Sequence, residues 1–333
     1  MNLSDLGELG LIARLRSRLM SDCFEVVQGL GDDAAVLRWR EDRLLLFTTD
    51  LLVEGQHFQL DWTTPEDLGW KALAVNVSDI GAMGGQPTFA VVSLGAPADT
   101  PVRLVDGLYE GLLGSGETYG VTIVGGDVVR SERLVLNLAL LGEVAPSALT
   151  LRSGAQPGEV LLVTGTLGDA AAGLYLLQHG AEEVPPPAAE AVRRTHHRPT
   201  PPLAAAQAIA RTGKVTAMID VSDGLAGDLG HLCTESQVGA RVKAAQIPLS
   251  PVCRTVAKAV GQDPLAWALH GGEDYQLLFT CPGEAVAEIR AAAEAVGVEV
   301  AVIGRITPSA EGVRLVEEDG REQPLEAGFD HFA

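Results

Sequence analysis

The chain has 333 residues with 47% hydrophobic and 5% aromatic residues, and its formal net charge is −20. This length predicts two domains, and the acidity excludes non-specific nucleic-acid binding, because phosphate backbones require lysine and arginine. The sequence has no run of 18 apolar residues that would predict a membrane span. Its four cysteines lack metal-binding or disulfide spacing, so we expect a reducing, cytoplasmic location.

The first half of the chain predicts helices mixed with strands. Residues 1–18 have the spacing of an amphipathic helix and lack the continuous apolar segment of a signal peptide. A second helix is expected over 64–81, because Thr64 can cap its first turn and Pro65 suits its first position. A third is expected over 101–119. Apolar runs predict strands at 34–37, 44–49, 89–94, 121–124 and 134–141.

Proline, glycine and serine residues between 145 and 158 indicate a domain boundary, which predicts an N-terminal domain at 1–145 and a C-terminal domain at 146–333. The proline-rich segment 184–202 is interpreted as a surface loop or a short helix with proline-rich arms. The second half also predicts strands at 160–163, 217–221, 276–280 and 298–303, and helices at 168–179 and 225–232. The mixture predicts an α/β (α+β) fold.

Six acidic, mostly glycine-containing motifs recur along the chain, most of them after a short apolar run. We therefore expect their carboxylates at the ends of strands, where side chains can converge. A single aspartate beside glycine is usually a turn residue, but crowded carboxylates repel one another unless cations neutralise them. The motifs are Gly31-Asp32-Asp33, Thr48-Thr49-Asp50, Ser78-Asp79, Gly125-Gly126-Asp127, Asp220-Val221-Ser222-Asp223-Gly224 and Gly271-Gly272-Glu273-Asp274.

Oxygen ligands of this kind suit Mg²⁺, which commonly accompanies substrate phosphates. The sequence lacks the lysine-bearing phosphate loop, the dinucleotide-binding glycine motif and the protein-kinase motifs. It also lacks the hydrolase nucleophile elbow and the zinc-protease helix motif. The pattern therefore predicts a metal-dependent enzyme that handles phosphates without a conventional nucleotide-binding loop.

Five further residues have a functional and a structural interpretation. Gly126 lets the backbone approach phosphate oxygens closely, although a lone Gly-Gly-Asp is weak evidence. Arg152 can clamp a phosphate or be an exposed linker residue, and His57 is more often structural at such a turn. Phe329 belongs to an aromatic end segment that either docks on the core or stacks on a flat heterocycle. Lys71 is interpreted as a solvated helix residue.

Seven motifs resemble, in the same order, those of the thiamine-monophosphate kinase family, and the resemblance covers essentially the whole chain. They occupy residues 29–35, 48–58, 71–84, 124–127, 220–225, 271–275 and 328–332. The resemblance implies a two-domain aminoimidazole ribonucleotide synthetase-like fold in which the N-terminal half forms the dimer interface. It implies a homodimer with ATP as co-substrate, and the acidity and the lack of a long apolar run predict no nucleic-acid or membrane partner. It also implies phosphorylation of thiamine monophosphate to thiamine diphosphate by direct in-line transfer with several Mg²⁺ ions.

The resemblance also assigns site residues. The metal-shell positions of the family match Asp33, Thr48, Thr49, Asp50, Asp79, Asp127, Asp220 and Asp223, among which Asp79, Asp127 and Asp223 are expected to be catalytic. The ATP-contact positions match Gly126, Asp127, Arg152 and Ser222. The substrate-contact positions match His57, Glu273 and Phe329, with the glutamate expected to face the cationic thiamine moiety.

Three other interpretations remain at this point. An ATP-dependent synthetase of the same superfamily would use the same aspartates but would not need His57 and Phe329. A silent metal- or nucleotide-binding scaffold would not require the full set of acidic positions. A calcium module is disfavoured, because the sequence has no loop of alternating acidic ligands closed by a glutamate.

Overall fold

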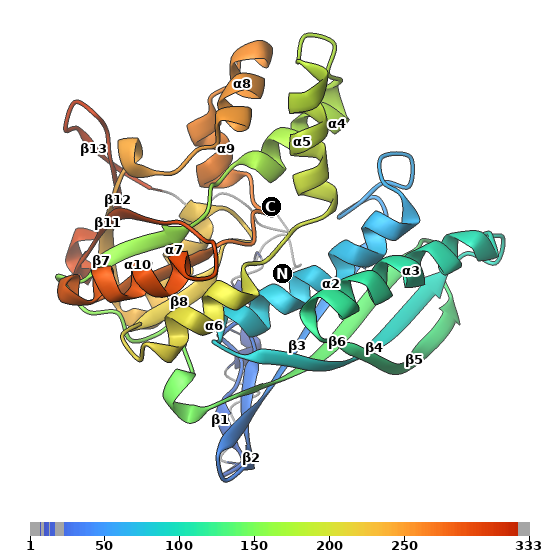
Figure 1. The fold of residues 1–333 in the computed structure, drawn as a ribbon, viewed down its shortest axis with the longest axis horizontal. Coiled ribbons are helices and arrows are strands. Elements are labelled where there is room, and N and C mark those ends of the chain that lie inside the picture. Colours follow the sequence, from blue (N-terminus) through green and yellow to red (C-terminus); the bar gives the residue numbers. More distant parts are fainter. Residues whose placement is uncertain (1–6, 8–9, 13, 17–22, 326–333) are drawn as a thin grey trace.

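The computed structural model describes residues 7, 10–12, 14–16 and 23–325. The described residues among 1–18 are helical, in agreement with the amphipathic pattern. Two sheets with their own helices lie side by side, and a group of helices stands over the region between them (Figure 1). The chain passes from the first sheet to the second through the short 3₁₀ helix η1 (Pro146–Ala148).

Within the described residues, the first sheet has six strands in the order β1-β2-β3-β6-β4-β5. Neighbouring strands are antiparallel except β4 and β5, which are parallel and joined by a helical crossover. The strands are β1 (Val26–Gln28), β2 (Ala35–Arg40), β3 (Arg43–Val53), β4 (Gln86–Ala96), β5 (Thr122–Arg130) and β6 (Val135–Val144).

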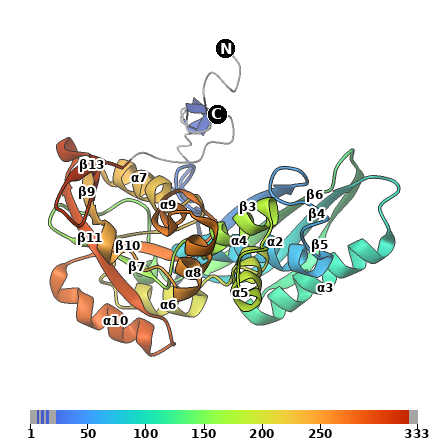
Figure 2. The same cartoon turned by 90° about the horizontal axis from the view of Figure 1, so that it is seen from above.

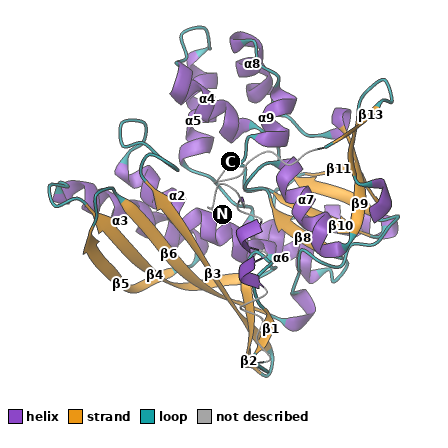
Figure 3. Cartoon of the chain, turned by 180° about the vertical axis from the view of Figure 1, so that it is seen from behind, coloured by secondary structure: helices purple, strands orange, loops and turns teal. Residues whose placement is uncertain are grey.

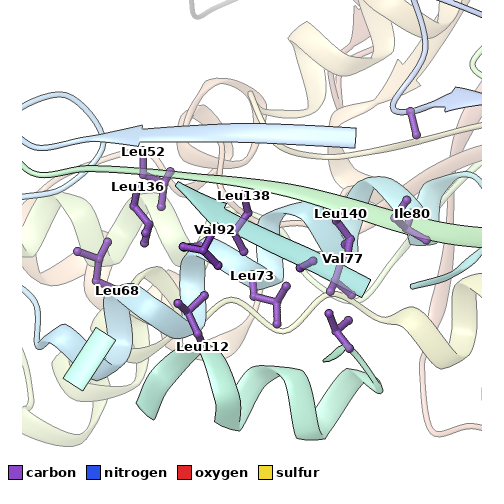
Figure 4. Packing of buried hydrophobic residues seen from close by; sticks show 14 of the residues in the cluster. Leu52, Leu68, Leu73, Val77, Ile80, Val92, Leu112, Leu136, Leu138 and Leu140 are labelled. Carbon is purple, nitrogen blue, oxygen red and sulfur yellow. The ribbon is translucent and has the colours of Figure 1, made fainter. Parts of the chain in front are cut away.

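Two long helices, α2 (Pro65–Ala82) and α3 (Val102–Tyr119), cover one face of this sheet. Side chains alternate along β6, so Leu136, Leu138 and Leu140 point toward the helices and form the core with Leu73 of α2 (Figure 4). Among the described residues, no helix lies against the opposite face of the sheet (Figure 3).

Helix α2 starts as the sequence predicts. The side chain of Thr64 accepts a hydrogen bond from the backbone N–H of Asp67 at 3.1 Å, and Pro65 occupies the first turn. A Cβ atom at Gly69 would collide with the carbonyl oxygen of Leu108, so glycine allows α2 and α3 to pack closely. Most of α2 is buried, because the sheet and α3 lie on one side of it and the second half of the chain on the other.

The second sheet of the described chain has seven strands in the order β13-β12-β9-β11-β7-β10-β8. They are β7 (Val160–Thr164), β8 (Ala217–Asp220), β9 (Val238–Lys243), β10 (Leu277–Cys281), β11 (Val300–Pro308), β12 (Val313–Val316) and β13 (Glu322–Pro324). The helices of this half are α4 (Asp169–His179), α5 (Pro186–His197), α6 (Leu203–Arg211), α7 (Leu225–Ser236), α8 (Pro251–Val260), α9 (Pro264–His270) and α10 (Val286–Glu294). Helices α6 and α10 pack together on one face of the sheet, whereas α7 and α9 pack on the other (Figure 2).

The elements expected from the apolar runs are all present, although most of the strands are longer than predicted. The proline-rich segment 184–202 contains α5, which settles the choice between a loop and a short helix. The sequence patterns did not identify the helices α6, α8, α9 and α10 or the strands β1, β9, β12 and β13. No helix among the described residues is long and apolar enough to cross a membrane.

The expectation that the acidic motifs end strands is wrong for three of them. Asp50 and Asp127 lie inside β3 and β5, and Asp79 lies inside α2. In a strand, a polar residue need not interrupt the element, because alternate side chains face opposite sides of the sheet. Asp220, at the end of β8, fits the expectation directly, whereas the motifs at 31–33 and 271–274 lie in the segments that precede β2 and β10.

Candidate active site

A cavity of about 830 Å³ opens between the two halves of the chain. Its walls come from β3 and the loop after it, from α2, from α4 and α5, and from the loops that follow β8 and α9. Aspartates gather on one side of the cavity, and a salt-bridged glutamate lies on another.

The aspartates form a carboxylate cluster, defined here as Asp33, Asp50, Asp79, Asp220 and Asp223. One carboxylate oxygen from each of Asp33, Asp79 and Asp220 lies within 4.8 Å of the others. These three residues come from the segment before β2, from α2 and from the end of β8, so the cluster joins both halves of the chain.

Two hydroxyl groups hold the cluster in place. Thr48 Oγ1 donates to Asp79 Oδ2 at 2.5 Å. Ser78 Oγ donates to Asp220 Oδ2 at 2.5 Å, and this buried bond links α2 directly to β8. Asp79 is therefore oriented by a residue of the adjacent strand β3, and Asp220 by a residue of the other half of the chain.

Burial and mutual repulsion disfavour ionisation in the cluster. Burial raises the pKa of Asp220 to about 8, with a further contribution from Asp33. Burial raises the pKa of Asp50 to about 6, with Asp223 as the next cause. The pKa of Asp79 also lies well above its usual range, because of burial and then Asp50. A cation bound beside these carboxylates would stabilise their ionised forms.

Arg152 partly supplies this charge. Its guanidinium donates to Asp33 Oδ1 at 2.5 and 3.0 Å, and its backbone N–H donates to Asp32. The other oxygen of Asp33 is buried and has no hydrogen-bond partner within the part of the chain that the structure describes. An orphaned carboxylate oxygen among hard oxygen donors fits Mg²⁺, which prefers such ligands.

Within one chain, the structure does not bring Gly126 and Asp127 to the cluster, and Thr49 lines the cavity without directing its hydroxyl group at the cluster. Thr49 faces the opposite side of β3 from Thr48, and its hydroxyl donates to the carbonyl of Leu138. Gly126 and Asp127 are exposed on the edge strand β5, and β6 and β4 lie between β5 and β3. Three strand spacings correspond to about 14 Å, too far for one metal shell.

The loop after β8 carries Ser222 and Asp223, which both line the cavity. The backbone N–H of Asp223 donates to Asp228 Oδ2 at 3.1 Å, so the buried Asp228 orients this loop from α7. The sequence analysis did not identify Asp228. Its position five residues after Asp223, in the first turn of a predicted helix, could have indicated that it lies close to the Asp223 loop.

Glu273 lies on another wall between two partners that the sequence analysis missed. Its Oε1 lies 2.5 Å from Lys71 Nζ, and its Oε2 lies 2.9 Å from His196 Nδ1. Burial would raise the pKa of Glu273, but Lys71 and then His196 hold this pKa far below its usual range. The interpretation of Lys71 as solvated is therefore wrong, since its side chain is only 5% exposed.

The signal for Lys71 was its place on the helix. It lies three residues after Leu68 and four before Val75, which puts a lysine on an apolar face. Among the other substrate candidates, His57 lines the cavity, and its Nδ1 accepts a hydrogen bond from the backbone N–H of Val53 at 3.1 Å. Phe329 lies outside the described residues.

Comparisons with known proteins place this geometry in context. The family model of the AIR synthase related protein N-terminal domain matches residues 31–144, and that of its C-terminal domain matches residues 156–317. The thiamine-monophosphate kinase of Escherichia coli (strain K12) is 38% identical over 98% of each chain. That of Mycobacterium tuberculosis (strain H37Rv) is 40% identical and covers 99% of this chain and 93% of its own length.

Solved structures agree with these matches. The structure described as AaThiL complexed with AMPPCP and TMP has a TM-score of 0.87 and 37% identity, and covers 99% of both chains. The hydrogenase maturation protein HypE of E. coli has a TM-score of 0.68 at 20% identity, so its similarity to this chain is one of fold only.

Proposed function

The chain belongs to the thiamine-monophosphate kinase family, and we propose that it transfers the terminal phosphoryl group of ATP to thiamine monophosphate. The products are thiamine diphosphate and ADP. The observation that carries this proposal is one cavity in which the carboxylate cluster and Glu273 both take part. The complex of the AaThiL neighbour with AMPPCP, an analogue of ATP, and TMP supports the choice of substrates.

Several Mg²⁺ ions fit the donor set, with Asp33, Asp50, Asp79, Asp220 and Asp223 as ligands and Thr48 beside them. When bound there, Mg²⁺ supplies the positive charge that offsets both phosphate groups. Asp79 and Asp223 have catalytic roles in this proposal, because they line the cavity and would hold the donor phosphates in position.

The chain's own groups orient the reactants. Arg152 is hydrogen-bonded to Asp33 of the carboxylate cluster and Ser222 lines the cavity, and we assign both residues to the nucleotide. The acceptor is itself a phosphate and is nucleophilic near neutral pH, so direct in-line transfer needs no strong general base. His57, Glu273 and Phe329 are assigned to the acceptor substrate.

We also propose a homodimer formed through the uncovered face of the first sheet. Large apolar side chains are exposed there, where a monomer would ordinarily present polar residues. The exposed apolar residues that the strand register places on this face are Phe47, Leu51, Phe89, Val91 and Val129. In this arrangement residues 1–145 form the ATP-binding and dimerisation domain, and residues 146–333 complete the active site.

In the proposed dimer, Asp127 can reach the active site of the facing copy, although it lies far from the carboxylate cluster of its own chain. The register places Asp127 beside Ser93 on the same face of the sheet as Thr49 and Phe89. Facing copies would therefore bring Gly126 and Asp127 of the partner subunit toward Thr49, completing the metal shell and the nucleotide site.

The first experiment is a chromatographic assay of the purified protein with ATP, Mg²⁺ and thiamine monophosphate. We expect thiamine diphosphate with one ADP per product molecule, and no product after addition of EDTA. ATP binding without this product would refute the acceptor assignment and favour another member of the superfamily.

Mixing two inactive variants tests the dimer. Subunits with Asp127→Ala and subunits with Asp79→Asn are denatured together and refolded. If Asp127 acts across the interface, a mixed dimer contains one intact site, so an equal mixture regains about a quarter of wild-type activity. No recovery, in a preparation that forms mixed dimers, would refute action across the interface.

A further inference from the structure

We propose that Lys71 and His196 are positioning residues that hold Glu273 as a charge-compensated hydrogen-bond acceptor for an N–H group of the acceptor substrate. On this view Glu273 does not act as the counter-ion of the substrate's cationic ring. The inference rests on the proposed function, because it names the part of thiamine monophosphate that the Glu273 wall recognises.

The contacts leave Glu273 available to a ligand. Lys71 Nζ contacts Oε1, and His196 Nδ1 lies 2.9 Å from Oε2 without the geometry of a hydrogen bond. A carboxylate offers about four acceptor positions, so each oxygen retains one. The side chain of Glu273 is 27% exposed and lines the cavity, whereas those of Lys71 and His196 are 5% and 7% exposed.

The charges on this wall determine what Glu273 can recognise. Lys71 is a full positive charge 2.5 Å from the carboxylate, so the pair has no net charge toward the cavity. A compensated carboxylate attracts a distant cation weakly, but its oriented lone pairs still accept short, directional hydrogen bonds. Thiamine monophosphate offers such a donor in the amino group of its pyrimidine ring.

The backbone around Glu273 is fixed in an unusual conformation. Glu273 and Tyr275 have positive φ angles of 61° and 48°, a region that side-chain-bearing residues rarely adopt. Their backbone N–H groups donate to the carbonyls of Ser222 and Val221 at 2.7 and 2.8 Å. The carboxylate of Asp274 accepts from the backbone N–H of Gly168 at 2.8 Å, before α4. Backbone strain that neighbours enforce in this way is typical of ligand-binding segments.

A strap at the end of α5 anchors His196 to the same helix that carries Lys71. Arg198 Nε lies 2.5 Å from Asp67 Oδ1, and the guanidinium lies over the ring of Trp70. Trp70 Nε1 donates to the carbonyl of Pro199 at 2.9 Å. Both partners of Glu273 are thus fixed to α2, so the carboxylate has one orientation toward the cavity.

A substrate analogue tests which group is recognised. We would compare thiamine monophosphate with the analogue in which hydrogen replaces the 4′-amino group, leaving the thiazolium cation unchanged. For the wild-type protein we expect kcat/KM to fall by about 100-fold or more with the analogue, because a buried acceptor would be left unpaired.

The double variant Lys71→Met/Glu273→Met should abolish this discrimination. It removes the pair together, which buried ion pairs tolerate better than loss of one partner. We expect kcat/KM for the two substrates to agree within about threefold in a variant that retains its melting temperature. A wild-type protein that uses both substrates equally well would overturn the inference in favour of a counter-ion role.

The positioning role of His196 is tested by a second set of variants. His196→Ala should raise KM for thiamine monophosphate about tenfold and leave KM for ATP unchanged. His196→Asn should recover most of this loss, because its amide nitrogen can take the place of Nδ1. His179→Ala is the control, since His179 is exposed on α4 and does not line the cavity.

The outcomes separate this inference from the proposed function. If the wild-type protein makes no thiamine diphosphate, the proposed function fails before the inference is tested. If the wild-type protein is active, equal increases in both KM values for His196→Ala would refute the positioning role. Failure of His196→Asn to recover activity while remaining folded would refute it as well.

Discussion

On one side of the cavity, Asp33, Asp79 and Asp220 crowd their carboxylate oxygens within 4.8 Å, and ionisation is disfavoured. On the other, a buried lysine and histidine hold Glu273 ionised. In the proposed function the first region needs cations that bind with the substrate, whereas in the second region Lys71 supplies the positive charge. Residues of one chemical type therefore acquire opposite roles, because desolvation and neighbouring charge decide the preferred protonation state.

Removing one carboxylate from the cluster should give the largest effect. We expect Asp79→Asn to lower kcat by at least about 10³-fold, because an amide is a weaker ligand and carries no charge. The folded structure should survive, since the substitution relieves repulsion at a buried site. The assay of ADP and thiamine diphosphate checks this, with the exposed Asp61→Asn as control. Near-normal turnover in Asp79→Asn would contradict the role of the cluster.

Removing Lys71 should leave Glu273, like the carboxylate cluster, without a neighbouring lysine to stabilise its ionised form. Lys71→Met leaves a partly buried carboxylate without its cation, which should lower the free energy of unfolding by about 3 kcal/mol. Urea denaturation measures the change, and the exposed Lys214→Met is the matched control. Equal stabilities for the two variants would mean that Lys71 and Glu273 are not coupled.

The two regions should also differ in their response to pH. The pKa values of Asp50, Asp32 and Asp220 are raised to about 6, 7 and 8. The folded protein holds these protons more tightly, so stability should fall as pH rises from about 5 to about 8, by about 1.4 kcal/mol per pH unit for each group still protonated. The lowered pKa of Glu273 has the opposite effect on stability. Ionised Glu273 stabilises the folded protein above about pH 4.5, and this stabilisation is lost as the pH falls below that value.

Thermal denaturation in EDTA across this pH range checks the prediction. Metal-free protein should be most stable near pH 5, and addition of Mg²⁺ should remove most of the decline toward pH 8. A stability profile that is the same with EDTA and with Mg²⁺ would argue against a cation site at the carboxylate cluster.

Loosening the strap should have the smallest effect. Trp70→Phe removes the hydrogen bond to Pro199 and should lower the free energy of unfolding by about 1 kcal/mol. Because the Arg198–Asp67 contact remains, kcat should change little and KM for the acceptor by about twofold. Denaturation and steady-state kinetics of this variant measure both, and a large fall in kcat would show that Trp70 does more than anchor the strap.

Much of the fold followed from local pattern. The cap at Thr64 and the apolar face of 64–81 predicted α2, and apolar runs predicted the long strands of the first sheet. Several elements of the second half were not predicted from the sequence. Short helices such as α6 and α9 and the edge strand β13 have too few residues for a clear hydrophobic periodicity. The proline-rich segment that contains α5 was predicted as a surface loop or a short helix with proline-rich arms, and nothing in its pattern indicated that it places His196 at the cavity.

The sequence by itself determined which chemistry was available: its acidic motifs, their order along the chain and the resemblance they carry. Only the tertiary structure decided which of these groups meet. It joined Ser78 to Asp220 and Lys71 to Glu273 across the two halves, and it left Asp127 on a distant edge strand. Local spacing governs turns and helix faces, but contacts between residues far apart in the chain depend on sheet order and helix packing. The same packing sets the desolvation and the neighbouring charges, which raise the pKa of Asp79 and Asp220 and lower that of Glu273.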